Sequence, residues 1–261
     1  MRILVLVKEV PDTYGSRRLH AGTGLLVRSA DPVLDEISER ALEVALDHAD
    51  HHPGTEVVAV CLGPAGAVTS VRKALAMGAD SAIHVVDDDL VGADAVLTAT
   101  VLAAAIRREA FDLVITGNAS TDGGGGVLPV MLSELLDVPA ATLLTSVEIA
   151  DGTLRGTRVA DGVRMTVTAS LPAVASITEA FPDPRFPSFK GTMAAKKKPL
   201  EQLALADLGI TVDPATTPYA IMTAVAARPP RAAGTKITDT GDAGRQLAAF
   251  LRSANLASRT P

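Results

Sequence analysis

The stretch Asp112–Pro139, DLVITGNASTDGGGGVLPVMLSELLDVP, decides how the rest of the chain is interpreted. Its first apolar run, residues 113–115, is typical of a parallel strand covered on both faces. Residues 127–136 have apolar side chains at helical spacing. Between them lie four consecutive glycines, Gly123 to Gly126. A glycine-rich turn that leads into a helix offers free backbone N–H donors and the positive end of the helix dipole, and both suit an anionic phosphate.

The alternative for this glycine run is an ordinary surface loop, which glycine runs form more often. Its position between a buried strand and a helix favours a nucleotide site. We therefore interpret the glycine run together with the other loops that follow strands.

Composition narrows the class of protein. Hydrophobic residues make up 48% of the 261 residues and aromatic residues only 3%, without any tryptophan. A core of small aliphatic side chains is typical of α/β proteins. The formal net charge of −6 argues against nonspecific nucleic-acid binding, which uses a basic face.

Cysteine usage and hydropathy add further limits. Cys61 is the only cysteine, so the chain has no internal disulfide and no cysteine-ligated cluster of its own. Because it lies in an apolar run, we expect a buried and inert thiol. The apolar N-terminal run is too short for a signal peptide, and no segment has the length of a membrane span. The sequence therefore predicts a soluble, cytoplasmic protein.

Strand and helix patterns alternate along the first half of the chain. Expected strands cover residues 2–7, 57–62, 82–86 and 113–116, and expected helices follow Asp31-Pro32 and cover residues 67–77 and 93–109. This alternation predicts a doubly wound, mostly parallel sheet of the Rossmann-like, adenine-nucleotide-binding type. Ligands in such sheets bind beyond the carboxyl ends of the strands. Lys8–Asp12, Gly63-Pro64 and the glycine loop all follow strands, so we expect them to converge on one site.

The second half of the chain has a different pattern. Residues 140–178 alternate apolar and polar side chains, with Asp-Gly turn signals, and predict strands that extend the sheet. Residues 181–191 contain three prolines, which argue against regular structure, and three of the five phenylalanines. Exposed aromatics beside basic residues favour a protein interface at about residues 182–198. The alternative is that the rings pack on the chain's own core and that the lysines are solvated.

We expect residues 1–215 to form the nucleotide-binding domain and residues 216–261 an extended arm. Catalytic signatures are missing: the chain has no GxGxxG after the first strand, no Walker lysine motif and no HExxH. The histidines at 48, 51 and 52 lack a metal-ligand pattern, and we expect them to face solvent. Asp122 is interpreted as a loop residue whose side chain accepts backbone hydrogen bonds, in preference to a catalytic acid.

Several motifs together resemble the electron transfer flavoprotein beta subunit, from residue 1 to about residue 240. They are Val7-Lys8 with Val10-Pro11-Asp12, Gly63-Pro64, Arg72–Asp80 (RKALAMGAD), the Gly117–Gly126 loop, Leu171–Val174 (LPAV), Pro184–Ser188 (PRFPS) and Ala195–Lys198 (AKKK).

This resemblance implies a heterodimer with an alpha subunit that holds most of the FAD, while the beta subunit binds a structural AMP and has no catalytic residues. Electrons would pass from flavin dehydrogenases, such as acyl-CoA dehydrogenases of fatty acid oxidation, to a membrane quinone oxidoreductase. The AMP site would consist of Leu6, Asp31, Pro32, Val33, Leu34, Leu62, Gly117, Asn118, Ala119, Ser120, Thr121, Asp122, Gly123, Gly124, Gly125, Gly126, Val127 and Leu128. The phosphate would lie on the backbone of Asp122–Gly126.

The resemblance also implies a segment that docks partner dehydrogenases, with Phe189 as the apolar anchor and the lysines at the rim. Its residues would be Pro184, Arg185, Phe186, Phe189, Met193, Lys196, Lys197 and Lys198. The arm would wrap the alpha subunit. Two alternatives stay open: a bifurcating type that holds a second FAD in place of AMP, and a stand-alone adenine-nucleotide sensor or ligase-like domain.

Overall fold

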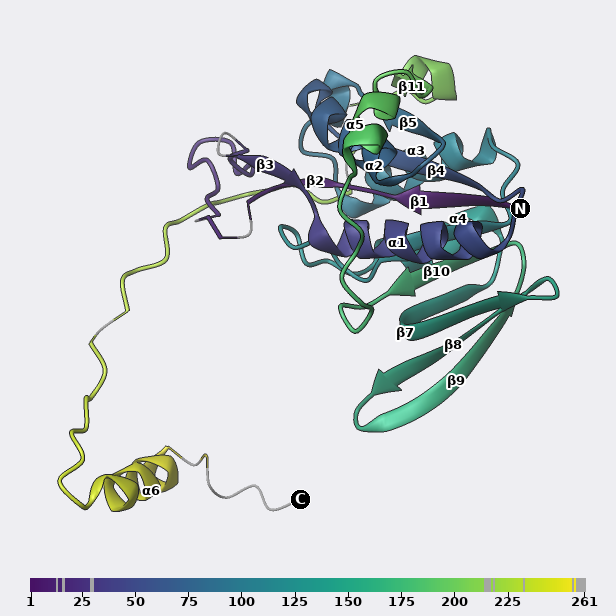
Figure 1. Cartoon of the computed structure of the whole chain (residues 1–261). Helices are drawn as coiled ribbons and strands as arrows, with labels where there is room; N and C mark the ends of the chain where they lie inside the picture. The colour runs from purple at the N-terminus through teal and green to yellow at the C-terminus, as the bar shows by residue number, and fades with distance from the viewer. Residues whose placement is uncertain are drawn as a thin grey trace. The chain divides into compact units, whose positions relative to one another are not determined.

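The computed structural model describes residues 1–12, 14–15, 17–28, 31–213, 217, 219–231, 233–254 and 256. Within this part, the chain forms two compact units, Met1–Val225 and Ala226–Pro261. The first unit is an α/β structure built on a nine-stranded sheet (Figure 1).

The sheet has the strand order β11-β5-β4-β1-β6-β10-β7-β8-β9. Every pairing from β11 to β7 is parallel, and the two pairings that join β7, β8 and β9 are antiparallel. The strands are β1 (Arg2–Leu6), β4 (Glu56–Leu62), β5 (Ser81–Val85), β6 (Leu113–Gly117), β7 (Ala140–Ala150), β8 (Thr153–Ala160), β9 (Val163–Ser170), β10 (Ala173–Ile177) and β11 (Leu200–Leu203). The doubly wound, mostly parallel sheet that the sequence predicts is therefore confirmed.

Helices cover both faces of the parallel part of the sheet. They are α1 (Glu36–His51), α2 (Val68–Met77), α3 (Ala95–Arg107), α4 (Leu128–Leu136) and α5 (Phe189–Ala195), with short 3-10 turns η1 (Ala65–Ala67), η2 (Asp88–Leu90) and η3 (Leu205–Leu208). One core lies between the sheet and α1, α2 and α5, and a second lies between the sheet and α3 and α4. The central strands are buried on both sides, because their side chains point alternately into the two cores.

The antiparallel extension follows the turn chemistry of its sequence. Asp151-Gly152 joins β7 to β8 and Asp161-Gly162 joins β8 to β9, and all four residues have positive φ. Two-residue hairpin turns with positive φ at both positions match the twist of the flanking strands. The Asp-Gly signals thus predict both hairpins correctly.

The structure corrects the helix expected from Asp31-Pro32. Residues Pro32–Leu34 form a short strand, β3, which pairs antiparallel with β2 (Glu9–Pro11), and α1 begins only at Glu36. Pro32 lies opposite Pro11 in this ladder, where both lack an N–H to donate. The apolar run of β3 thus extends a hairpin before the helical pattern begins.

One further element differs from the expectation of irregular structure at residues 181–191. The helix α5 begins at Phe189, two residues after the last proline of the segment, and the Ser188 side chain caps it by accepting a hydrogen bond from Gly191 N at 2.9 Å. Residues Leu200–Leu203 add the edge strand β11 beside β5. Because the last proline precedes the helix, the prolines determine where the helix can begin but do not prevent it from forming.

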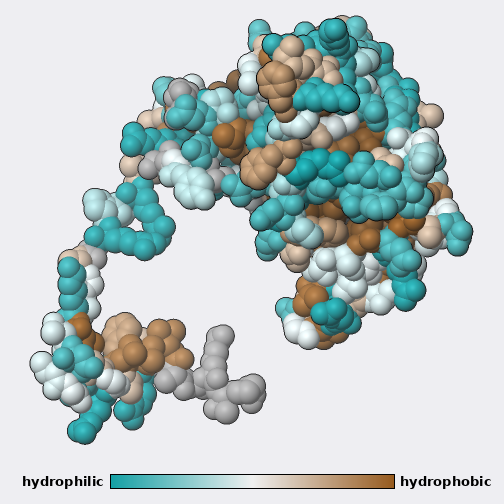
Figure 2. Space-filling model, viewed as in Figure 1, coloured by the Kyte–Doolittle hydropathy of each residue, from teal (hydrophilic) through white to brown (hydrophobic). Residues whose placement is uncertain are grey.

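The second unit contains α6 (Ala243–Ser253). None of the α6 residues is buried. Hydrophobic side chains gather along this helix, as Figure 2 shows, and Leu247 and Phe250 are more than half exposed.

Candidate functional site: a glycine loop at the switch point of the sheet

The strand order places a topological switch point at β1. The chain moves from β1 to β4 and β5 on one side and then returns to β6 on the other side of β1. Leu6, Leu62 and Gly117 end three neighbouring parallel strands, so the loops that follow them leave from the same edge of the sheet. Open α/β sheets bind ligands at such a point.

Gly117 lets β6 approach α1 closely. A Cβ atom at this position would lie 2.7 Å from Cγ1 of Ile37, which is shorter than a contact allows. The glycine at the start of the loop is therefore required by packing.

The first half of the glycine loop is fixed by hydrogen bonds. Asn118 N donates to Ile177 O at 2.8 Å, and Thr121 N donates to Oδ2 of Asp35 at 2.9 Å. Asp35 is fully buried just before α1, and burial raises the pKa of its carboxyl group. The backbone between β6 and the glycines is thus held from β10 on one side and from Asp35 on the other.

Asp122 is the centre of a charged cluster. Its side chain is only 2% exposed. Its Oδ1 lies 2.6 Å from Lys8 Nζ, and its Oδ2 lies 3.4 Å from Nη2 of Arg28. Burial acts to raise the pKa of Asp122, but the hydrogen bond and the charge of Lys8 outweigh it and lower the pKa.

Asp122 also accepts a hydrogen bond from Gly123 N at 2.6 Å. The side chain thus accepts a backbone hydrogen bond, as the sequence predicts. It fixes the point at which the glycines begin.

The second half of the loop presents its backbone to solvent. Residues 123–127 are exposed, and Gly125, Gly126 and Val127 N–H groups donate to no acceptor among the described residues. Gly124 and Gly126 have φ values of 60° and 65°, which side chains with a Cβ adopt at a cost. Free donors therefore precede α4, the arrangement that binds phosphate at helix N-termini.

The expected second segment of the site, residues 31–34, divides into exposed and buried parts. Asp31 is exposed and has a φ of 35°, in the left-handed region that Asn and Asp tolerate best. Pro32 is exposed and Val33 half-buried, whereas Leu34 is 1% exposed and belongs to the core. Leu6 and Leu62 are half-buried against the second core.

The expected docking segment, residues 184–198, is held at both ends and displays apolar side chains between them. Arg185 forms ion pairs with Glu43 and Asp50 of α1, at 2.8 and 2.9 Å. Phe186 and Phe189 are 93% and 86% exposed, and Met193 is about half exposed. The alternative that these rings pack on the chain's own core is wrong for Phe186 and Phe189 and holds only for Phe181.

The three lysines of the run have different environments. Lys196 and Lys197 are exposed. Lys198 Nζ donates to three backbone carbonyls at the C-terminal end of α2, those of Leu75, Gly78 and Ala79, at 3.1, 3.0 and 2.6 Å. Burial lowers the pKa of Lys198. Its ammonium group thus caps a helix, and only its two neighbours are free to meet acidic groups at a rim.

Comparison with known proteins identifies the family. A family model described as "Electron transfer flavoprotein domain" matches residues 23–208. The chain belongs to the electron transfer flavoprotein beta-subunit family. It is 45% identical to the electron transfer flavoprotein subunit beta of Mycobacterium tuberculosis, over 95% of this chain and 97% of that protein.

More distant members of the family cover somewhat less of the chain. The subunit beta of Bacillus subtilis is 35% identical over 80% of this chain and 81% of its own length. A protein named caffeyl-CoA reductase-Etf complex subunit CarD, from Acetobacterium woodii, is 33% identical over 81% of each chain. Membership of the electron transfer flavoproteins places the protein among electron carriers that act with flavin.

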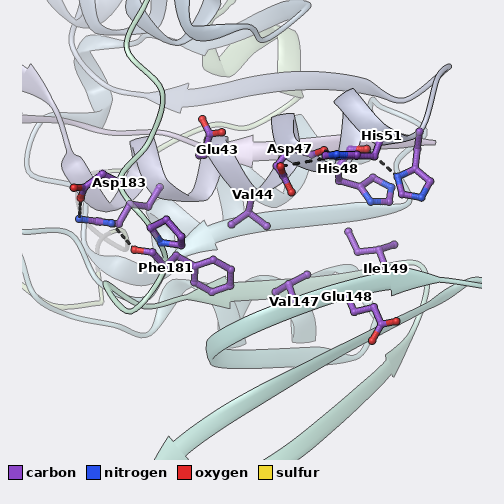
Figure 3. Close-up of a pocket in the computed structure, with 13 residues that line it drawn as sticks. Glu43, Val44, Asp47, His48, His51, Val147, Glu148, Ile149, Phe181 and Asp183 are labelled. Carbon is purple, nitrogen blue, oxygen red and sulfur yellow. Dashed lines mark hydrogen bonds and ion pairs between the residues drawn. The ribbon is translucent and has the colours of Figure 1, made fainter.

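Two cavities of this electron transfer flavoprotein chain lie away from the glycine loop. One, of about 440 Å³, lies between α1, β7 and residues 181–183 (Figure 3). Its floor is apolar, and three of its charged side chains are paired: Arg40 binds Asp183 and Phe181 O, and Glu43 binds Arg185. The other, of about 780 Å³, lies at the amino-terminal edge of the sheet. Each cavity is lined by residues from several helices, strands and turns.

The three clustered histidines, His48, His51 and His52, line the cavity between α1 and β7 and not the glycine loop. His51 and His52 are exposed, whereas His48 is half-buried and stacks on His52 with ring centroids 4.0 Å apart. Across the described residues, no group of three or more His, Cys, Asp or Glu side chains is placed to hold a metal ion. Cys61 is buried, and burial raises its pKa to about 12, as expected of an inert thiol. No described helix is long and apolar enough to span a bilayer.

Two residues that hold the flavoprotein's glycine loop, Arg28 and Asp35, are not expected there from the sequence, whereas Lys8 belongs to the segment Lys8–Asp12 that is expected to converge on the site. Lys8 carries a weak signal, because it is the first charge after the buried strand β1. Asp35 also carries one, as a polar residue between apolar Leu34 and Ile37 that proves fully buried. Arg28 lies in an irregular segment and carries none.

Proposed function

We propose that the chain is the nucleotide-binding beta subunit of a heterodimeric electron carrier, with an adenine nucleotide, AMP, on the loop Gly117–Leu128. The observation that carries this proposal is the loop itself. Its first half is fixed by Asp35 and Asp122, while its second half offers free N–H donors to solvent in front of α4. A preformed set of donors suits phosphate, because little ordering is required when the ligand binds.

In this proposal the chain carries no catalytic residues, and the FAD that shuttles electrons belongs mainly to the alpha subunit. The partners are flavin dehydrogenases and a membrane quinone oxidoreductase. The docking surface consists of Phe186, Phe189 and Met193, with Lys196 and Lys197 beside it. The segment is held by Arg185 at one end and by Lys198 at the other, and its apolar side chains are exposed to solvent. Burying them against a partner is therefore favourable.

The second unit supports the alpha-subunit part of the proposal. The helix α6 has exposed Leu247 and Phe250 and no buried residue, so its apolar side chains gain from a partner surface. In this proposal, the protein that covers these apolar side chains is the alpha subunit.

Family membership favours the carrier over a stand-alone nucleotide sensor or ligase-like domain, because the chain is similar to beta subunits along 95% of its length. The bifurcating type, with a second FAD in place of AMP, is the alternative within the family. The similarity to subunit CarD of a caffeyl-CoA reductase-Etf complex supports this alternative.

The test is to purify the chain together with its alpha subunit, denature the complex and identify the released nucleotides. One FAD and one AMP per heterodimer support the proposal. Two FAD and no AMP support the bifurcating type. A chain that copurifies with no subunit and releases no nucleotide contradicts both.

A further inference from the structure

Lys8 and Arg28 are two cations from the first part of the chain that reach the glycine loop. Lys8 follows β1, and Arg28 lies in the segment between β2 and β3. Both contact Asp122, more than ninety residues away along the chain. A Cβ atom at Gly123 would lie 3.9 Å from Lys8 Nζ, so the ammonium group lies beside the backbone that leads into the free N–H groups.

The hydrogen bonds that these cations make leave donors to spare. A lysine ammonium has three N–H donors and an arginine guanidinium has five. Lys8 Nζ donates to Ser120 Oγ at 3.2 Å and to Asp122 Oδ1 at 2.6 Å. Arg28 donates to Glu9 O at 2.9 Å and to Asp122 Oδ2 at 3.4 Å. Among the described residues, Lys8 therefore keeps one donor and Arg28 keeps three.

Exposure shows which member of the cluster meets a ligand. The Asp122 side chain is 2% exposed, whereas the side chains of Lys8 and Arg28 are 39% and 34% exposed. The carboxylate thus lies beneath the two cations and fixes them, and the cations face solvent. The nearby carboxylates of Asp122, Asp35 and Glu9 are buried, so the charges that this end of the loop presents to solvent are those of the two cations, which attract an anion.

We infer that Lys8 and Arg28 are phosphate-binding side chains of the nucleotide site, and that Asp122 is the positioning residue that holds both of them beside the glycine loop. This inference rests on the proposed nucleotide site and adds to it a source of specificity. Backbone N–H groups can donate to any anion of suitable shape, whereas two fixed cations favour the doubly charged phosphate monoester of a nucleotide over an uncharged nucleoside.

The test compares AMP with adenosine, which lacks the phosphate. Full-length chain, copurified with its alpha subunit, is incubated with labelled AMP, and displacement by unlabelled AMP and by adenosine gives the preference for the phosphate. We expect Lys8→Met and Arg28→Met each to reduce this preference about 10- to 100-fold, the range for hydrogen bonds to charged groups. Lys8→Arg keeps a cation and should retain most of it.

Arg18→Met is the matched control. It removes the same charge from the same segment, but the Arg18 side chain is exposed and has no part in the cluster. The control should leave the preference unchanged. Equal losses of AMP and adenosine binding in Lys8→Met would mean that Lys8 only orders the loop, and an unchanged preference in both variants would also overturn the inference. A wild-type complex that binds no nucleotide would instead overturn the proposed site as a whole.

Discussion

The Arg185 guanidinium and the Glu43 carboxylate form a two-pronged pair, with Nε 2.8 Å from Oε2 and Nη2 2.9 Å from Oε1. Glu43 Oε2 also accepts a hydrogen bond from Arg185 N at 2.9 Å. One carboxylate on α1 therefore fixes both the side chain and the backbone at the start of the docking segment. Its hydrogen bond raises the pKa of the Arg185 guanidinium. The expected docking segment is thus held by α1, a helix that also packs against Gly117 at the start of the glycine loop.

Glu43→Gln should release this end of the docking segment. Loss of a paired charge in good two-pronged geometry should lower the free energy of unfolding by about 1 kcal/mol. Electron transfer with partner dehydrogenases should slow as well, because Phe186 and Phe189 are no longer held in one position. Glu201→Gln, which breaks the surface pair with Arg108, is the control and should leave partner kinetics unchanged.

Phe189→Ala should slow electron transfer to or from partners by about 10- to 30-fold, the effect of removing an aromatic anchor from the centre of an interface. The nucleotide content should stay the same, because Phe189 lies outside the glycine loop. Tyr14→Ala is a suitable control, since Tyr14 is also an exposed aromatic side chain, at 95%. Partner kinetics that do not change in Phe189→Ala would contradict the docking role.

Gly124→Ala should reduce the nucleotide content of the purified protein. The backbone φ of 60° costs a residue with a Cβ about 1–2 kcal/mol, and the loop relieves this cost by moving its N–H groups. Gly152→Ala has the matching strain, at a φ of 69° and with open space around its Cβ, in the turn between β7 and β8. Released AMP, quantified per chain, should fall in the first variant only. Equal nucleotide content in both would contradict a phosphate site on the loop.

Asp35→Asn should stabilise the chain increasingly as the pH rises. Burial raises the folded-state pKa of Asp35, so the folded chain disfavours the ionised carboxyl group. This cost is absent below the unfolded-state pKa and grows until the pH reaches the raised folded-state value. Asn can still accept the hydrogen bond from Thr121 N, but it does not ionise. Urea unfolding of both proteins between about pH 4 and pH 7 measures the difference. A difference that is constant across this range would contradict the ionisation of a buried Asp35.

Lys198→Met should destabilise the chain by about 1.5–3 kcal/mol, because three carbonyls at the end of α2 lose a charged donor. Its neighbour provides the control, since Lys197 is exposed and Lys197→Met should change the free energy of unfolding by less than about 0.5 kcal/mol. We expect the reverse order for association with partner dehydrogenases. Lys197→Met should lower the association rate and its salt dependence, as rim charges do.

Local pattern predicts most of the sheet correctly. The strands β1, β4, β5 and β6 are apolar runs followed by Gly, Pro or a helical pattern, and both Asp-Gly hairpins are visible in the sequence. The error at Pro32–Leu34 has a tertiary cause. Nothing in that short apolar run shows that it pairs with Glu9–Pro11, which lies more than twenty residues earlier.

The glycine loop is visible in the sequence, and Lys8 is expected near it because it follows a strand, but the contacts that support the loop are not visible. The backbone donors follow from the glycines and from the helix after them. Lys8, Arg28 and Asp35 reach the loop from positions between 86 and 114 residues away, as in the Thr121–Asp35 and Asp122–Lys8 hydrogen bonds. Spacing along the chain carries no information about such contacts. For the same reason, the sequence shows three lysines in a row but not that one of them caps α2.

The long span of these contacts has a consequence for how the subunit forms. Asp122 meets Lys8 across 114 residues, and Asn118 is fixed by Ile177, which comes later still. The glycine loop is therefore not in place until β10 has joined the sheet, when most of the first unit has been synthesised. Pairings between distant parts of a chain form slowly. A nucleotide that binds only the finished arrangement stabilises it by mass action, so retained nucleotide measures how much of the subunit has folded to completion.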